Sequence, residues 1–177
     1  MGSNSAGFFS KNKDGSNTIQ SPFIKSLWNF MHSYNHRRYW KRRDIVTNPK
    51  NKASKLKKII LLFLLKRNDI KHHSSFGTNL NQGAFFKSPP ILPHGPYGII
   101  IGFDCKIGNN AIIYHQVTIM DGNVIIGDNV LIGAGAKILP NVQIGNNVKI
   151  GANCVVVGDI PDNATVVLQK PRIINGK

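Results

Sequence analysis

Acidic residues are scarce in this chain. It has 8 Asp and Glu against 23 Lys and Arg, which gives a formal net charge of +15 at pH 7. The imbalance is confined to one part: residues 1–75 carry 16 basic and 3 acidic residues, whereas residues 76–177 carry 7 and 5. The basic character therefore belongs to the N-terminal part, and the C-terminal part is close to neutral.

Long apolar runs are also missing. The longest purely apolar run is Ile59–Leu65, far short of the roughly 20 residues that a membrane-spanning helix needs. The N-terminus lacks the apolar segment of a secretory signal, and Ala6 stands where a myristoylation motif has Ser or Thr. These features are compatible with a cytoplasmic location and with membrane contact that is at most peripheral.

An aliphatic residue recurs every six positions through the C-terminal half, with one step of seven. A strand has period 2 and a helix about 3.6, so a strict six predicts a repeat in which each unit is one short strand and one corner. Three units close a coil of about eighteen residues, the architecture of a parallel β-helix. The repeating residues are Ile101, Ile107, Ile113, Ile119, Ile126, Ile132, Ile138, Ile144, Ile150 and Val156.

Two further columns accompany the aliphatic one. A small or β-branched residue follows four positions later in nearly every repeat, and Cys105 and Cys154 both fall in this column. We therefore expect both thiols to be buried, and neither a disulfide nor a nucleophile. Asn is expected to adopt left-handed backbone angles at the corners, because it tolerates them; these residues are Asn109, Asn110, Asn129, Asn146, Asn147 and Asn153.

The part before the repeats is predicted to be helical and basic. Helices are expected over 22–43 and 53–68, with a break at Thr47-Asn48-Pro49. The first residues are rich in Ser, Asn, Gly and Lys and have little to bury, which is typical of disorder. The chain therefore divides into a disordered N-terminus, a basic helical region, a β-helix and a C-terminal tail: residues 1–20, 21–75, 76–168 and 169–177.

Three interpretations of the basic helices remain open. Their apolar sides could cap the open end of the β-helix, as such ends require. They could bind an anionic membrane surface or acidic glycan. Nucleic-acid binding is disfavoured, because no recognised nucleic-acid module surrounds the aromatic and basic residues. For an anionic partner, the expected contacts are Arg37, Arg38, Lys41, Arg42 and Arg43.

Two histidines lie in the repeats and share a register. His94 stands two residues after Leu92, and His115 two residues after Ile113. If Leu92 is a key aliphatic, the two histidines stack on one edge of adjacent coils, roughly 5 Å apart. Both positions point outward, which favours a functional role over a buried structural one at His94 and leaves the two roles equally open at His115.

The same edge continues as a strip of small residues. The equivalent positions on the next two coils are Ala134 and Ala152, where a long thin ligand could lie against the backbone. Glycine and alanine also suit tight corners, which is the simpler explanation. Two stacked histidines could instead hold zinc with His72 or His73, but no third histidine lies in the repeats and no metal is expected.

At these residues the sequence resembles the hexapeptide-repeat acyltransferases, most closely their serine acetyltransferase-like branch, many of which act on bacterial surface sugars. The matching stretches include LPHGPYGIIIG, IIYHQVTI, IGAGAKIL and KPRII. The resemblance implies a mainly β, left-handed parallel β-helix, trimers or assemblies of trimers, and acetyl-CoA in a groove between subunits. It implies His94 as general base, and the following residues along the cofactor: Gly133, Ala134, Gly135, Ala136, Lys137, Gly151, Ala152, Lys170 and Arg172.

Two departures from the serine acetyltransferase pattern bear on the acceptor. Pro93 stands where an Asp commonly precedes the histidine, and Met120-Asp121 replaces a Gly-Gly and shortens the loop that follows. We therefore predict an acetyl-CoA-dependent O-acetyltransferase that acts on a sugar hydroxyl of a bacterial surface polysaccharide or its precursor. His115 is expected to orient His94 or bind the acceptor. The alternatives are a serine O-acetyltransferase, and a non-catalytic or nucleic-acid-binding β-helix protein.

Overall fold

The fold is described from a computed structural model, in which residues 9–11, 17–19 and 34–169 are described. The chain divides into two compact units, Met1–Asn35 and His36–Lys177. In the first unit, β1 (Phe9–Lys11) pairs antiparallel with β2 (Asn17–Ile19), where the sequence analysis expected disorder over residues 1–20. The remaining residues of that stretch, and those expected to be helical from 22 to 33, lie outside the described part.

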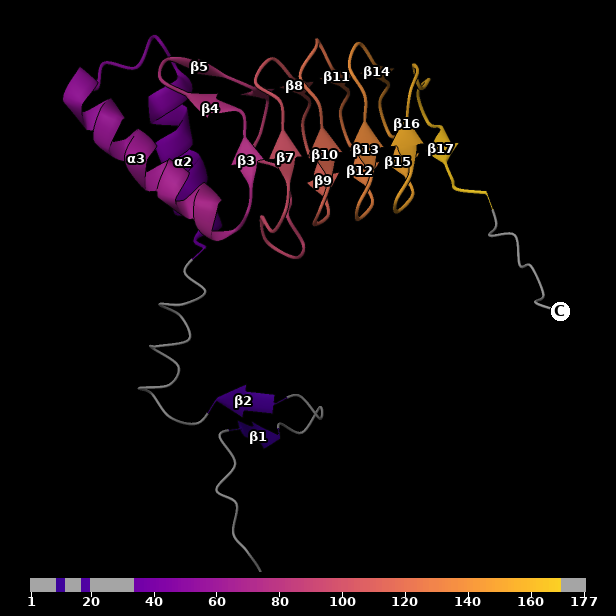
Figure 1. Ribbon diagram of the computed structural model, residues 1–177, viewed down its shortest axis with the longest axis horizontal. Coiled ribbons are helices and arrows are strands. Elements are labelled where there is room, and N and C mark those ends of the chain that lie inside the picture. The colour runs from indigo at the N-terminus through magenta and orange to yellow at the C-terminus, as the bar shows by residue number, and fades with distance from the viewer. Residues whose placement is uncertain (1–8, 12–16, 20–33, 170–177) are drawn as a thin grey trace, which may run out of the picture. The chain divides into compact units, whose positions relative to one another are not determined.

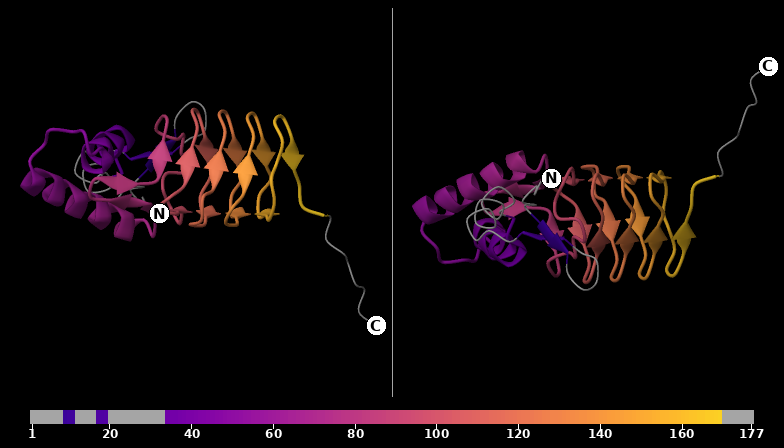
Figure 2. Two further views of the ribbon diagram at one scale, coloured as in Figure 1. Left: turned by 90° about the horizontal axis from the view of Figure 1, so that it is seen from above. Right: turned by 90° about the horizontal axis from the view of Figure 1, so that it is seen from below.

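The second unit is a parallel β-helix of three sheets (Figures 1 and 2). Each coil contributes one two-residue strand to each sheet, and strands of successive coils pair in parallel. This confirms the predicted left-handed parallel β-helix. The first sheet has β3 (Ser75–Phe76), β7 (Ile100–Ile101), β10 (Thr118–Ile119), β13 (Lys137–Ile138) and β16 (Val155–Val156); the second has β6 (Phe85–Phe86), β8 (Lys106–Ile107), β11 (Ile125–Ile126) and β14 (Gln143–Ile144); the third has β9 (Ile112–Ile113), β12 (Leu131–Ile132), β15 (Lys149–Ile150) and β17 (Thr165–Val166).

The predicted aliphatic column forms the core. Each of its ten members is at most 3 % exposed and stacks on the equivalent residue of the neighbouring coil; Ile132, for example, pairs with Ile113 and Ile150. Cys105 and Cys154 are free and buried as predicted, and burial raises the pKa of the Cys105 thiol to about 12. A thiol with so high a pKa is not a nucleophile at neutral pH.

The seven-residue step between Ile119 and Ile126 is absorbed by one turn. Asn123 has a φ of 58° there, and the Asp104 carboxylate accepts hydrogen bonds from the backbone N–H groups of Gly122 and Asn123. These two hydrogen bonds lower the pKa of Asp104, and the bond from Asn123 has the larger effect. The insertion is therefore closed by polar contacts from the preceding coil, and the core register resumes at Ile126.

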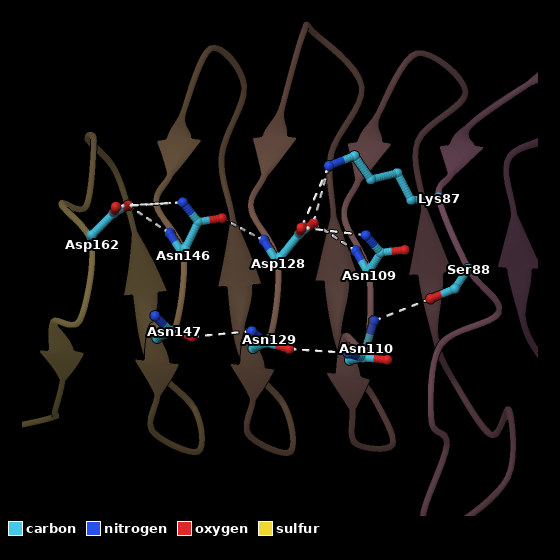
Figure 3. A network of polar contacts seen from close by, with 9 residues as sticks. All are labelled: Lys87, Ser88, Asn109, Asn110, Asp128, Asn129, Asn146, Asn147 and Asp162. Atoms are coloured by element: carbon cyan, nitrogen blue, oxygen red, sulfur yellow. Dashed lines mark hydrogen bonds and ion pairs between the residues drawn. The ribbon is translucent and has the colours of Figure 1, made fainter.

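Asparagine and aspartate form ladders along one corner of the β-helix (Figure 3). The amide of Asn110 donates to Asn129 at 3.1 Å, and Asn129 donates to Asn147 at 3.1 Å. Positive φ was correctly predicted at Asn110, Asn129, Asn147 and Asn153. It was wrong at two positions, Asn109 and Asn146, whose side chains instead bond the neighbouring coil at Asp128 and Asp162.

Two helices and a hairpin close the N-terminal end of the β-helix (Figure 1). Helix α2 (His36–Thr47) ends at the predicted Thr47-Asn48-Pro49 break, and α3 (Lys55–Lys71) begins after the N-cap Ser54, whose hydroxyl accepts from the N–H of Lys57. Strands β4 (Thr78–Asn79) and β5 (Gln82–Gly83) pair antiparallel beside them. Within the described residues, we find no helix whose length and apolar content would let it span a bilayer.

Arg43 is the buried centre of this cap. It is 4 % exposed, and its guanidinium donates to the carbonyls of Phe76 at 2.9 Å and Ala84 at 2.6 Å and to the hydroxyl of Thr78 at 3.0 Å. Burial lowers the pKa of Arg43 to about 10, so the group stays charged at neutral pH. The prediction that Arg43 contacts an anionic partner is therefore wrong, because its donors are used inside the protein.

Candidate active site

The two histidines predicted to stack do meet. The Nδ1 atoms of His94 and His115 are 2.9 Å apart, and the ring centroids are separated by 4.9 Å. His94 is exposed, as an outward position requires. The ring of Tyr114 packs edge-on against His94, with a centroid distance of 5.4 Å. The coil register alone therefore brings two imidazoles from residues 21 positions apart into hydrogen-bond contact.

The segment that carries His94 is held to the next coil at both ends. Ile91 donates its N–H to the Ala111 carbonyl and accepts from the N–H of Ile113, which confirms the register assumed for Leu92. On the other side, the Tyr97 carbonyl accepts from the N–H of Gln116. The bulge between these anchors needs left-handed backbone, and Gly95 and Gly98 supply it with φ of 72° and 66°.

A hollow of about 440 Å³ opens beside the pair. Its walls include residues of the helix–strand junction as well as the coil corner. His72 is buried there, its Nδ1 lies 2.8 Å from the Asn68 carbonyl oxygen, and its ring meets Tyr97 edge-on at 5.0 Å. The full lining is His72, His73, His94, Tyr97, Gly98, His115 and Gln116.

Sequence reasoning singled out His94 and His115 but not the role of Tyr97 and Gln116. His72 and His73 were considered as possible zinc ligands. The structure places both at the hollow, yet no group of three or more His, Cys, Asp or Glu among residues 34–169 is placed to hold a metal ion. Since the chain turns back from α3 into β3 at this point, only the fold could bring the junction beside the coil corner.

The strip of small residues continues from the histidine pair as predicted. Gly135 donates its N–H to the His115 carbonyl, and Asn153 donates to the Ala134 carbonyl, so Ala134 and Ala152 follow His115 on successive coils. Ala152 is exposed and Ala134 is partly exposed. These two side chains are the members of the strip that a ligand could touch directly.

Other members of the predicted strip are explained by coil stacking. A Cβ at Gly133 would lie 2.6 Å from the backbone nitrogen of Ala152, so the coils could not close with any larger residue there. Ala136 is fully buried, and it could reach a ligand only through its backbone. Lys137 donates its ammonium to the Gln116 carbonyl at 3.0 Å and to the Thr118 hydroxyl at 3.1 Å. Gly151 donates its N–H to the Val166 carbonyl of the next coil, while Lys170 and Arg172 are outside the described residues.

A larger hollow of about 990 Å³ lies elsewhere, beside α2, β5 and β6. None of the strip residues or the histidine pair lines it. Its charged groups include the exposed Arg37 and Lys41 and the already bonded Arg43. The site chemistry therefore points to the smaller hollow, where two imidazoles share a hydrogen bond.

Two family models match inside the β-helix. The model of bacterial transferase hexapeptide, with six repeats, matches residues 123–158, and the model of the hexapeptide repeat of succinyl-transferase matches residues 95–115. The second match contains His115 and begins one residue after His94. Together with the relatives described below, these matches support a hexapeptide-repeat acyltransferase superfamily for the β-helix, in its serine acetyltransferase-like branch.

Two curated relatives are serine acetyltransferases. Serine acetyltransferase of Staphylococcus xylosus is 43% identical over 98 residues, which is 51% of this chain and 45% of the relative. The chloroplastic serine acetyltransferase 1 of Arabidopsis thaliana is 39% identical over 128 residues, 68% of this chain and 39% of the relative. The chain thus spans less than half the length of the curated relatives that it matches.

Solved structures agree with the superfamily assignment. A serine acetyltransferase in complex with CoA has a TM-score of 0.60 and 27% identity, with 78% of this chain and 56% of that chain covered. A serine acetyltransferase in complex with cysteine has a TM-score of 0.61 and 26% identity, over 85% and 58% of the two chains. The enzyme of Neisseria gonorrhoeae has a TM-score of 0.54 and 35% identity, over 67% and 47%.

Proposed function

We propose that the protein transfers acetyl from acetyl-CoA to a hydroxyl group, with His94 as general base. The contact that carries this proposal is the 2.9 Å hydrogen bond between the Nδ1 atoms of His94 and His115, at the head of the strip of small residues. For the Nε2 atom of His94 to take a proton, its Nδ1 must carry one and donate it to the Nδ1 of His115. His115 then accepts this hydrogen bond and holds the ring in the tautomer that a base needs.

The reaction needs no covalent intermediate on the protein. His94 takes the hydroxyl proton as the oxygen attacks the thioester carbonyl, the C–S bond breaks, and the same proton passes to the departing thiolate. The strip fits the cofactor's thin arm, because Ala134 and Ala152 present only methyl groups at the surface. By resemblance, Gly133, Gly135, Ala136, Lys137 and Gly151 would lie along the cofactor's arm, and Lys170 and Arg172 would act near its nucleotide end.

L-serine is the acceptor that the relatives' names support. The sequence pattern favoured a sugar hydroxyl, but the comparisons favour the alternative acceptor, since the curated relatives described above are named serine acetyltransferases. Transfer to serine would require groups that bind its ammonium and its carboxylate. We therefore take serine as the first acceptor to test.

One observation keeps the sugar acceptor as a second candidate. The lining of the hollow contains no Asp or Glu, and Pro93 stands beside His94 where the related pattern has an Asp. An ammonium group without an anionic partner loses much of its binding energy on leaving water. A neutral polyol would suit this lining, which is rich in imidazole and phenol groups.

The test is the release of CoA thiol from acetyl-CoA with L-serine, and separately with neutral sugars, at matched concentrations. His94→Ala should lower the turnover of the preferred acceptor by about 10²–10⁴-fold, whereas Lys106→Ala, an exposed change on the second sheet, should not change it. Near-normal activity of His94→Ala would refute the base assignment. Turnover of sugars without serine would identify the second candidate as correct.

A trimer with the cofactor groove between subunits is part of the same proposal, on the strength of the resemblance. Analytical ultracentrifugation of the full chain should give a mass of three times 19.6 kDa, or a multiple of that trimer. A monomer that turns over acetyl-CoA at the full rate would contradict a groove shared between subunits.

A further inference from the structure

One face of helix α3 is buried. Lys58, Leu65 and Asp69 are each at most 4 % exposed. The ammonium of Lys58 donates to the Asn48 carbonyl at 2.9 Å and to the Asn81 side chain at 2.7 Å, and Asp69 accepts from the Tyr39 hydroxyl at 2.6 Å. This face joins α3 to α2 and the first coil, and it contains Asp69, the one acidic residue of the helix.

The opposite face of α3 is apolar and open. Five large side chains are exposed on it: Leu56 at 68 %, Ile59 at 46 %, Ile60 at 52 %, Phe63 at 67 % and Ile70 at 75 %. At 3.6 residues per turn they fall within an arc of about 100°, opposite the buried Leu65. An arc of this width is what a helix normally buries against something, and it runs along a helix of 17 residues, about 25 Å long.

Cations border this apolar arc on both sides. Lys55 and Lys66 flank one edge, Lys57 and Lys71 flank the other, and Arg67 lies within the arc; all five are exposed. Asp69 is the helix's sole acid and faces inward. The exposed surface of α3 therefore carries positive charge alone.

We propose that this face of α3 binds the surface of an anionic lipid bilayer, with the helix lying in the plane of the interface. An open apolar arc bordered by Lys and Arg is the pattern of helices whose apolar face enters the boundary between headgroups and acyl chains. Anionic headgroups attract the bordering cations. A second copy of the same face is disfavoured, because five cations would meet five cations.

The proposed anionic contact lies on α3, whereas the sequence predicted it on α2. The bases of α2 include Arg43, which is buried and bonded, and the aromatic residues Tyr39 and Trp40 are also buried. Helix α2 is thus a cap, as one of the sequence interpretations held. Helix α3 lies at the same end of the β-helix (Figure 1), and its bases and large apolar side chains are exposed.

Vesicle sedimentation of the full chain tests the proposal. Binding is measured to phosphatidylcholine vesicles and to vesicles with about one third phosphatidylglycerol. The wild type should bind only the anionic vesicles. Phe63→Ser should weaken this binding about tenfold, since one buried aromatic side chain contributes about a factor of ten or more, and Leu56→Ser with Phe63→Ser about a hundredfold. Val157→Ser, which removes a side chain 74 % exposed at the other end, should leave binding unchanged.

Two double variants with the same change in net charge distinguish binding at α3 from attraction by the total charge of the protein. Lys57→Glu with Lys66→Glu should abolish binding, while Lys106→Glu with Lys149→Glu, which makes the same change on the β-helix, should weaken it far less. Equal loss in both pairs would overturn the proposal in favour of diffuse attraction. Equal binding to neutral vesicles would also overturn it.

Insertion is read independently from a Phe63→Trp variant. Its fluorescence should shift to the blue on anionic vesicles and be quenched by lipids brominated near the headgroup. Loss of self-association in Phe63→Ser, with no vesicle binding by the wild type, would show that a second copy covers the face. Slow amide exchange across α3 in protein that binds no vesicles and whose assembly is unchanged by Phe63→Ser would show that another part of this chain covers the face; either result overturns the proposal.

Discussion

Replacing Arg43 by Met should strongly destabilise the cap of the β-helix. The change removes three donated hydrogen bonds, two of them to the buried carbonyls of Phe76 and Ala84 at 2.9 and 2.6 Å. The Phe76 carbonyl would keep only a long contact of 3.5 Å with the Thr78 hydroxyl. Each buried acceptor left without a donor costs about 1–3 kcal/mol.

The cation also packs on two aromatic rings. Its Cζ atom lies 4.7 Å from the ring centre of Phe86 and 5.3 Å from that of Trp40, contacts that contribute about 0.5–2 kcal/mol together. Met restores much of the apolar contact and removes the cost of burying a charge. The net loss should therefore be about 3–5 kcal/mol, a large share of the roughly 5–15 kcal/mol that stabilises a domain.

The measurement is urea unfolding followed by circular dichroism at fixed protein concentration. Arg37→Met is the matched control, because Arg37 is exposed on the same helix and its loss should cost less than about 0.5 kcal/mol. The melting temperature of Arg43→Met should fall by about 10 °C, at roughly 2–4 °C per kcal/mol for a domain of this size. Equal midpoints for the two variants would show that Arg43 does not hold the cap.

Three further predictions concern the core, the buried acid and the groove. Ile132→Asp should prevent folding, because it buries a carboxylate without a partner and removes about 1.5–3 kcal/mol of apolar burial; a soluble variant with a cooperative melt would contradict the register. Burial raises the pKa of Asp69 to about 6, above the unfolded value near 3.9, so its ionisation should cost the fold up to about 3 kcal/mol as pH rises from 4 through 6. Asp69→Asn should flatten that slope in unfolding curves measured across this range, and an unchanged slope would mean that another group causes it. Ala134→Tyr should raise the KM for acetyl-CoA at least tenfold while the melting temperature stays within a few degrees; an unchanged KM would place the cofactor elsewhere.

The cap shows why part of the fold was not predicted. The sequence indicated two basic helices near the observed positions, yet it gave Arg43 the same role as Arg37. Helix α2 has no acidic residue three or four positions from Arg43, so whether the guanidinium meets water or three buried acceptors depends on how α2 packs on the first coil. The same packing decided that α3 would leave Leu56 and Phe63 exposed.

The sequence by itself determined the β-helix, its core and the meeting of His94 with His115. A six-residue period fixes which residues of successive coils are aligned. Residues that stand two positions after stacked aliphatic residues must therefore stack as well. The tertiary structure alone decided that His72 and Tyr97 help to line the hollow beside the two histidines. It also decided which face of α3 is buried and which is exposed. Those contacts join segments that no repeat relates, and only the packing of the helices against the first coil brings them together.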